Sequence, residues 1–146
     1  MSLSRKTLSV IYALIAVAAF AGTWAHNAAY LHLGWLGANV QFWRETLVNP
    51  ASASITVDIF FFALAANLWM VLEARRIGLR WVWAYVLAGA LVAVSVAFPL
   101  FMLHRERVLA SRGEMGTAYE LRAGDAIGLL MLGAVVVAYT LWTFRH

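Results

Sequence analysis

The chain has 146 residues, of which 64% are apolar and 12% are charged, whereas an ordinary soluble domain has roughly 45–50% apolar and about 25% charged residues. This small number of charged side chains cannot cover the surface of a water-soluble fold of this length. We therefore expect the apolar residues to face lipid. The net charge of +4 forms no basic stripe, which excludes nucleic-acid binding, and the absence of cysteine excludes disulfides, iron–sulfur clusters and thiolate sites.

Four apolar runs each approach the roughly 20 residues that an α-helix needs to cross a membrane. Because the runs lack the alternation of barrel strands, we predict that they are helices. The four predicted spans are residues 8–25, 51–72, 81–103 and 126–144. The sequence therefore predicts an all-α fold, a four-helix transmembrane bundle that forms one integral-membrane domain over residues 1–146.

The first run resembles a secretory signal peptide, because Arg5 and Lys6 precede it and small residues near Phe20 imitate a cleavage site. We predict that it is retained as a signal anchor and forms the first transmembrane helix. Residues 26–50 are too polar to cross the membrane, but their aromatic residues are typical of a helix that lies at the membrane surface. We therefore expect an interfacial segment between the first and second spans.

Residues with well-known positional preferences mark the ends of the second span. Asn49 and Pro50 suit the N-cap and the first helical position, and Gly78 is typical of a residue that stops a helix. In the third span, Pro99 lies one turn before the predicted end. We expect this proline to bend the helix, because it removes a backbone hydrogen bond.

Three spans carry small residues at a four-residue spacing, a pattern that lets helices pack closely. These residues are Ala18 and Gly22 in the first span, Gly89, Ala93 and Ala97 in the third, and Gly124 and Gly128 in the fourth. The sequence therefore predicts close helix packing within the chain or between copies.

The basic residues favour a cytoplasmic N-terminus by a margin of one residue. With four spans, six Lys and Arg residues fall inside and five fall outside. The inner set is Arg5, Lys6, Arg75, Arg76, Arg80 and Arg145, and the outer set is Arg44, Arg105, Arg107, Arg112 and Arg122. We predict a multi-pass protein of the bacterial cytoplasmic (inner) membrane with its N-terminus inside.

Charged residues border the cytoplasmic end of the second span. Arg75, Arg76 and Arg80 form the basic pattern that is typical of this side of a membrane and attracts anionic lipid. Glu73 is three residues from Arg76, a spacing at which helical side chains meet. We therefore predict an ion pair between Glu73 and Arg76 or a neighbouring arginine.

Asp58 is the residue that most suggests a site. It lies eight residues after Pro50, which is ~12 Å along a helix that rises 1.5 Å per residue. A carboxylate near the middle of a membrane costs ~2.5–3.5 kcal/mol to insert. Asp58 should therefore be protonated, paired or exposed to a wet cavity, either as a general acid in a site or as a structural hydrogen-bonding group.

Histidines are the other candidates for a site. With four spans, His26, His32 and His104 reach the same outer side as Asp58, where a ligand cavity would lie beneath residues 26–50. Histidines can ligate a metal or a haem, but interfacial histidines also hydrogen-bond headgroups and loop carbonyls, and this spacing identifies no cofactor or metal. The candidate ligand-binding residues are His26, His32, Trp69, His104 and Asp125.

Four short elements occur in order between Trp35 and Leu109. They are Asn49-Pro50-Ala51-Ser52, Asp58, the run Glu73-Ala74-Arg75-Arg76-Ile77-Gly78, and Pro99-Leu100-Phe101 followed by Arg105-Glu106. Together they resemble an uncharacterised bacterial integral-membrane family, a domain of unknown function whose members look like shorter, three-helix proteins. The resemblance supports the second and third helices, makes the fourth an addition and supplies no reaction.

Two functions remain open at this point. The sequence shows no nucleophile, phosphate-binding loop or paired carboxylates at catalytic spacing, which favours a non-catalytic subunit or a hydrophobic-ligand-binding helix bundle. The alternative is an intramembrane enzyme that acts on an isoprenoid or other lipid, with Asp58 as general acid. The expected partners are membrane lipids and either further copies, as a homo-oligomer, or other subunits of a membrane complex.

Overall fold

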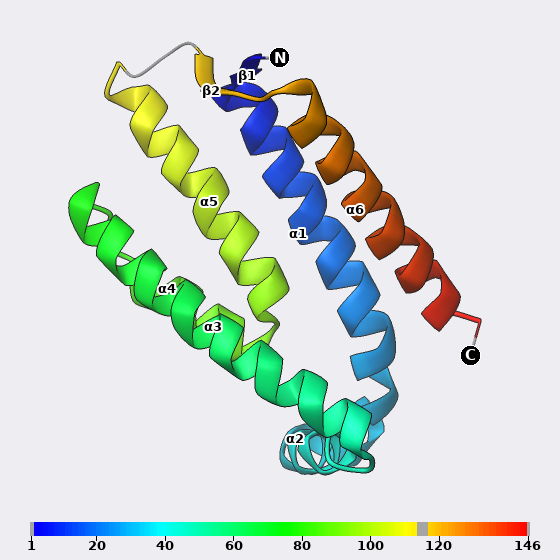
Figure 1. The fold of residues 1–146 in the computed structure, drawn as a ribbon. Coiled ribbons are helices and arrows are strands. Elements are labelled where there is room, and N and C mark those ends of the chain that lie inside the picture. Colours follow the sequence, from blue (N-terminus) through cyan, green and yellow to red (C-terminus); the bar gives the residue numbers. More distant parts are fainter. Residues whose placement is uncertain (1, 114–116, 146) are drawn as a thin grey trace.

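The computed structural model describes residues 2–113 and 117–145. Its elements in chain order are β1 (Ser2–Ser4), α1 (Arg5–Asn27), the 3-10 helix η1 (Ala28–Leu33), α2 (Gly34–Glu45), α3 (Pro50–Arg76), α4 (Val82–Leu91), α5 (Val94–Ser111), β2 (Thr117–Glu120) and α6 (Ala123–Thr143) (Figure 1). Among the described residues, α1 with its continuation to Glu45, α3 and α6 are long and apolar enough to cross a membrane. The predicted all-helical fold class is confirmed, and three helices, not four, have the length and composition that crossing a membrane requires.

The third predicted span, 81–103, is not one helix. The helix stops at Val92 and Ala93, where Ala93 adopts extended backbone (φ −178°, ψ 141°), and α4 and α5 turn back on one another as a helical hairpin. The break lies six residues before Pro99, which is buried within α5. Val92, Val94 and Val96 have low helix propensity because they are β-branched. The local sequence therefore favours a continuous helix only weakly at the break.

Small residues close the hairpin. A Cβ atom built on Gly89 would lie 3.7 Å from the Cβ of Ala97, which is van der Waals contact, so the two arms approach closely at this point. The predicted row of Gly89, Ala93 and Ala97 is therefore wrong as one face of one helix, because Gly89 and Ala97 belong to opposite arms. Gly22 of α1 does approach another helix, with its built Cβ 3.2 Å from Thr140 Cγ2 of α6.

The hairpin therefore begins and ends at the same end of the bundle, because α4 runs away from the end of α3 and α5 returns to it. Arg112, just after α5, donates from Nη2 to the carbonyl of Ile77, just after α3 (2.6 Å). Strand β1 pairs antiparallel with β2, which brings the N-terminus to the start of α6. We call this the basic end; it holds the N-termini of α1 and α6 and the C-termini of α3 and α5 (Figure 1).

The opposite end holds η1, α2, the start of α3 and the end of α6. Figure 1 views α2 nearly along its axis, so this helix crosses the end of the bundle, as expected of an interfacial segment. Trp43 of α2 stacks on Phe60 of α3, with ring centroids 5.4 Å apart. The predicted cap of α3 is confirmed, because Asn49 Oδ1 accepts a hydrogen bond from the Ser52 amide (2.9 Å).

The buried core lies toward the basic end, where the hairpin packs on the last turns of α3. Its residues are Met70, Ala74, Ile77, Leu79, Val82, Phe101 and Leu109. Gly78 adopts φ 67°, a conformation that glycine tolerates, and ends α3 as predicted. Helix α6, which the structure describes in full, contains no buried residue. The bundle is thus tight at the basic end and loose along α6.

Candidate functional site

A network of five charged side chains joins three helices at the basic end. Glu106 of α5 is fully buried, and its carboxylate accepts hydrogen bonds from Arg5 Nη1 of α1 (2.6 Å) and from Arg105 Nη1 (2.6 Å). Arg105 also donates from Nε to Glu73 of α3 (2.6 Å). Arg76 completes the set with two hydrogen bonds of 2.6 Å to Glu73, which is 8% exposed. We call these five residues the ion-pair network.

Arg105 is the centre of the network. Its guanidinium contacts both carboxylates, lies 6.0 Å from the centroid of the Trp69 ring, and donates to the hydroxyl of Tyr119 in β2 (3.2 Å). Burial lowers the pKa of Arg105, but its hydrogen bonds to Glu73 and Tyr119 outweigh burial and raise the pKa. Arg105 therefore keeps its charge and fixes α3, α5 and β2 relative to one another.

The network suits a structural role better than acid–base chemistry. Each carboxylate is held by two arginines, so neither is left to exchange a proton with a substrate. The predicted pair of Glu73 with Arg76 is confirmed. The prediction that Arg105 and Arg76 lie on opposite sides of the membrane is wrong, because the hairpin returns α5 to the end where α3 finishes.

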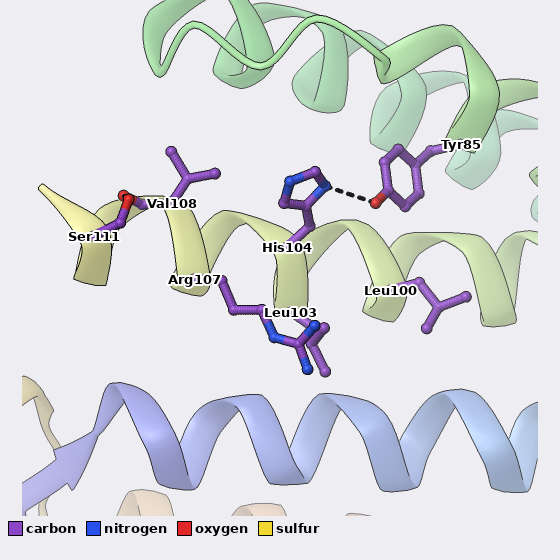
Figure 2. A pocket seen from close by; sticks show the side chains of 7 residues that line it. All are labelled: Tyr85, Leu100, Leu103, His104, Arg107, Val108 and Ser111. Atoms are coloured by element: carbon purple, nitrogen blue, oxygen red, sulfur yellow. Dashed lines mark hydrogen bonds between the residues drawn. The ribbon is translucent and has the colours of Figure 1, made fainter.

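Two cavities flank α5 at the basic end. The first has a volume of about 460 Å³ and lies beside the hairpin. Its lining residues are Tyr85, Leu100, Leu103, His104, Arg107, Val108 and Ser111 (Figure 2). Figure 2 shows His104 pointing toward Tyr85, whose hydroxyl lies 2.8 Å from His104 Nδ1. Burial raises the pKa of the Tyr85 hydroxyl, so it stays protonated and can donate this hydrogen bond.

The second cavity has a volume of about 360 Å³ and lies between α1 and α5. Its lining residues are Arg5, Lys6, Ser9, Val10, Glu106, Arg107 and Ala110. Arg107 lines both cavities, and Figure 2 shows its side chain extending from α5 toward α1. The basic end therefore has two hollows that share one arginine.

Asp58 lies away from both cavities. It is exposed on α3 and has no hydrogen bond or ion pair with any other residue that the structure describes. His104 lines the first cavity, and Asp125 accepts a hydrogen bond from the Arg122 amide (2.9 Å) at the start of α6. The expectation that Asp58, His104 and Asp125 meet on one side is wrong, because the hairpin places the last two at the basic end.

The remaining candidates are also dispersed. His26 Nε2 lies 3.1 Å from Thr143 Oγ1, and His32 Nδ1 lies 2.7 Å from the carbonyl of Ala29. Trp69 packs against Phe101 and beneath Arg105. Neither cavity includes a residue from 26–50, where we expected one. Within the described part of the chain, no three His, Cys, Asp or Glu residues are grouped closely enough to hold a metal ion.

The order of these elements agrees with a family model of protein of unknown function DUF2834, which matches residues 11–107. The chain belongs to this family. The DUF2834 match runs from α1 to α5, so it includes Asp58, Glu73 and the hairpin, whereas β2 and α6 lie outside it. No curated protein and no solved structure shows significant similarity to the chain. Membership in DUF2834 confirms the resemblance expected from the sequence and assigns no reaction.

Proposed function

We propose that this DUF2834 protein is a non-catalytic subunit of a membrane assembly, in which two copies pack through the face of α3 that carries Asp58. One observation carries the proposal. Asp58 is exposed on a helix that is long and apolar enough to cross a membrane, without a partner among the residues that the structure describes. A carboxyl group in this position needs a polar partner from outside the chain.

The surroundings of Asp58 make lipid a poor neighbour for its carboxyl group. Asp58 lies ~12 Å along α3 from Pro50, and Ile55, Phe61 and Phe62 beside it are all exposed. Lipid tails can cover these three side chains but cannot hydrogen-bond to Asp58. A protein contact at this face would cover the apolar side chains and also satisfy the carboxyl group.

A second copy of the chain supplies a suitable partner. Two copies inserted in the same direction place their Asp58 residues at the same depth, and a two-fold axis along the membrane normal lets each α3 meet its equivalent. Two carboxyl groups that face each other can share one proton in a hydrogen bond. The contact is therefore self-complementary.

The ion-pair network supports the non-catalytic part of the proposal. Both of its carboxylates are occupied by arginines, and no described residue hydrogen-bonds to Asp58 to act with it. An enzyme that acts on an isoprenoid or other lipid, with Asp58 as general acid, would need such a second group to position the substrate or stabilise its charge. The isolated position of Asp58 therefore favours assembly over catalysis.

Cysteine cross-linking in native membranes tests the contact, because the chain has no cysteine of its own. Ala65 lies two turns after Asp58 on the same face of α3, and Leu64 is its exposed neighbour on another face. We expect oxidation to link Ala65→Cys into a dimer and to leave Leu64→Cys monomeric. Asp58→Leu should abolish the Ala65→Cys dimer, whereas Asp58→Asn, which can still hydrogen-bond, should retain part of it.

Three results would contradict the proposal. They are an Ala65→Cys variant that stays monomeric, equal cross-linking at Ala65 and Leu64, and a product whose mass is not that of two copies. The last result would identify a different protein as the occupant of this face.

We further propose that the basic end faces the cytoplasm of a bacterium and that the opposite end faces outward across its inner membrane. The hairpin changes the distribution of charge that supports this orientation. Nine of the 11 Lys and Arg residues now lie at the basic end, and only Arg44 and Arg145 lie at the opposite end. An excess of nine over two follows the positive-inside rule much more clearly than six over five.

A further inference from the structure

The cavity between α1 and α5 has an excess of positive charge. Its charged lining residues are Arg5, Lys6, Glu106 and Arg107. Arg5 and Glu106 neutralise one another across 2.6 Å. Lys6 and Arg107 have no hydrogen bond or ion pair within the described residues, so two cations border the same hollow without a described anion paired to either.

The cavity continues into an apolar track along α1. Val10 lines the cavity, and Leu14 and Val17 follow it at four- and three-residue intervals, which places all three on one side of the helix. All three side chains are exposed. A cationic hollow at the end of an exposed apolar stripe matches a molecule that has an anionic head and a hydrocarbon tail.

The cations have the chemistry that a phosphate group needs. A guanidinium and an ammonium both donate hydrogen bonds to phosphate oxygens, and charge assistance strengthens those bonds. Arg5 cannot turn to a ligand without breaking its ion pair with the buried carboxylate of Glu106. Lys6 and Arg107 are therefore the groups that are available to an incoming anion. The cavity, at about 360 Å³, is large enough for a headgroup phosphate and its glycerol.

We propose that this cavity binds the phosphate of an anionic phospholipid through Lys6 and Arg107, with one acyl chain along Val10, Leu14 and Val17. The basic end would then be held at the headgroup layer by a specific lipid as well as by its overall charge. This site is independent of the Asp58 contact, since it lies on other helices at the other end of the bundle.

Native mass spectrometry of the full chain in mild detergent tests the site, with phosphatidylglycerol as the probe. Phosphatidylcholine tests the need for net negative charge, and inorganic phosphate tests binding of a free anion. We expect one phosphatidylglycerol to be retained in preference to phosphatidylcholine, and no saturable binding of phosphate. Replacing Lys6 and Arg107 by Gln together should weaken the binding of phosphatidylglycerol by roughly 25-fold, since each basic residue near the membrane contributes about a fivefold factor.

The matched control removes the same charge from the same end of the bundle. Arg75 and Arg80 are exposed at the basic end and line neither cavity, so Arg75→Gln with Arg80→Gln should keep the bound lipid. Equal losses in both double variants would show only a general attraction to basic surface and would overturn the proposal. Saturable phosphate binding without preference for the lipid would identify a free-anion site and would overturn it too.

A single substitution distinguishes a loss of lipid binding from a loss of folding. Lys6 is exposed in the first turn of α1 and has no partner among the described residues, so Lys6→Gln should leave the melting temperature unchanged. We expect it to lower phosphatidylglycerol affinity about fivefold. An unchanged affinity in this folded variant would contradict the role assigned to Lys6.

Discussion

Glu106 is the residue where a change of one atom should have the largest effect on stability. Glu106→Gln keeps the size of the side chain but removes the anion between Arg5 and Arg105. Breaking a buried ion pair by removing one partner costs about 3–5 kcal/mol, because it leaves an uncompensated charge in a buried site. We expect a loss of that size in the free energy of unfolding, measured by denaturation in detergent.

Glu120→Gln is the control for this measurement. Glu120 is an exposed acid in β2 at the same end of the bundle, and surface substitutions change stability by roughly 0.5 kcal/mol or less. Similar small effects of Glu106→Gln and Glu120→Gln would show that the ion-pair network does not hold the helices together.

For single residues, the sequence predicts contacts that are local and misses those that depend on topology. Glu73 and Arg76 are three residues apart on one helix, so their ion pair follows from helix geometry alone. Arg105 and Glu73 are 32 residues apart, and they meet only because α5 returns to the end of α3. A carboxyl group in an apolar run marks Asp58 in the sequence, but its exposure depends on how α3 faces the bundle.

Among the elements, the α4 and α5 hairpin is the feature that the sequence predicts least well. Residues 81–103 have the length and composition of a transmembrane helix, and the break at Val92 and Ala93 contains neither glycine nor proline. Hydrophobic periodicity does not distinguish a span from two shorter buried helices. One feature of the sequence argues against this span. With four spans, Lys and Arg residues divide six to five between the two sides of the membrane, which is a weak charge asymmetry.

A larger side chain at Gly89 should force the hairpin open. Its built Cβ already lies 3.7 Å from both Ala97 Cβ and Val94 Cα, so Gly89→Leu overpacks the contact. We expect a loss of about 1–3 kcal/mol in the free energy of unfolding in detergent. Gly128→Leu on α6 is the control, because a Cβ there meets nothing within 4 Å; a loss as large as that of Gly89→Leu would show that the hairpin contact is not the cause.

For the whole molecule, the hairpin decides how the charges and the candidate sites are distributed. It leaves α1, α3 and α6 as the helices able to cross the membrane in the described chain. It also gathers the ion-pair network, both cavities and nine of the 11 basic residues at one end. Asp58, His26 and His32 remain toward the other end, so the single outer site expected from four spans separates into unrelated positions.

Labelling of single cysteines by a membrane-impermeant thiol reagent tests this topology directly. Arg80→Cys lies between α3 and α4, Glu120→Cys lies in β2, and Val48→Cys lies between α2 and α3. We predict that Val48→Cys reacts in intact cells, whereas Arg80→Cys and Glu120→Cys both react only when the cytoplasmic face is opened to the reagent. If Arg80→Cys and Glu120→Cys reacted from opposite sides of the membrane, residues 81–103 would cross it as one span, which would contradict the hairpin.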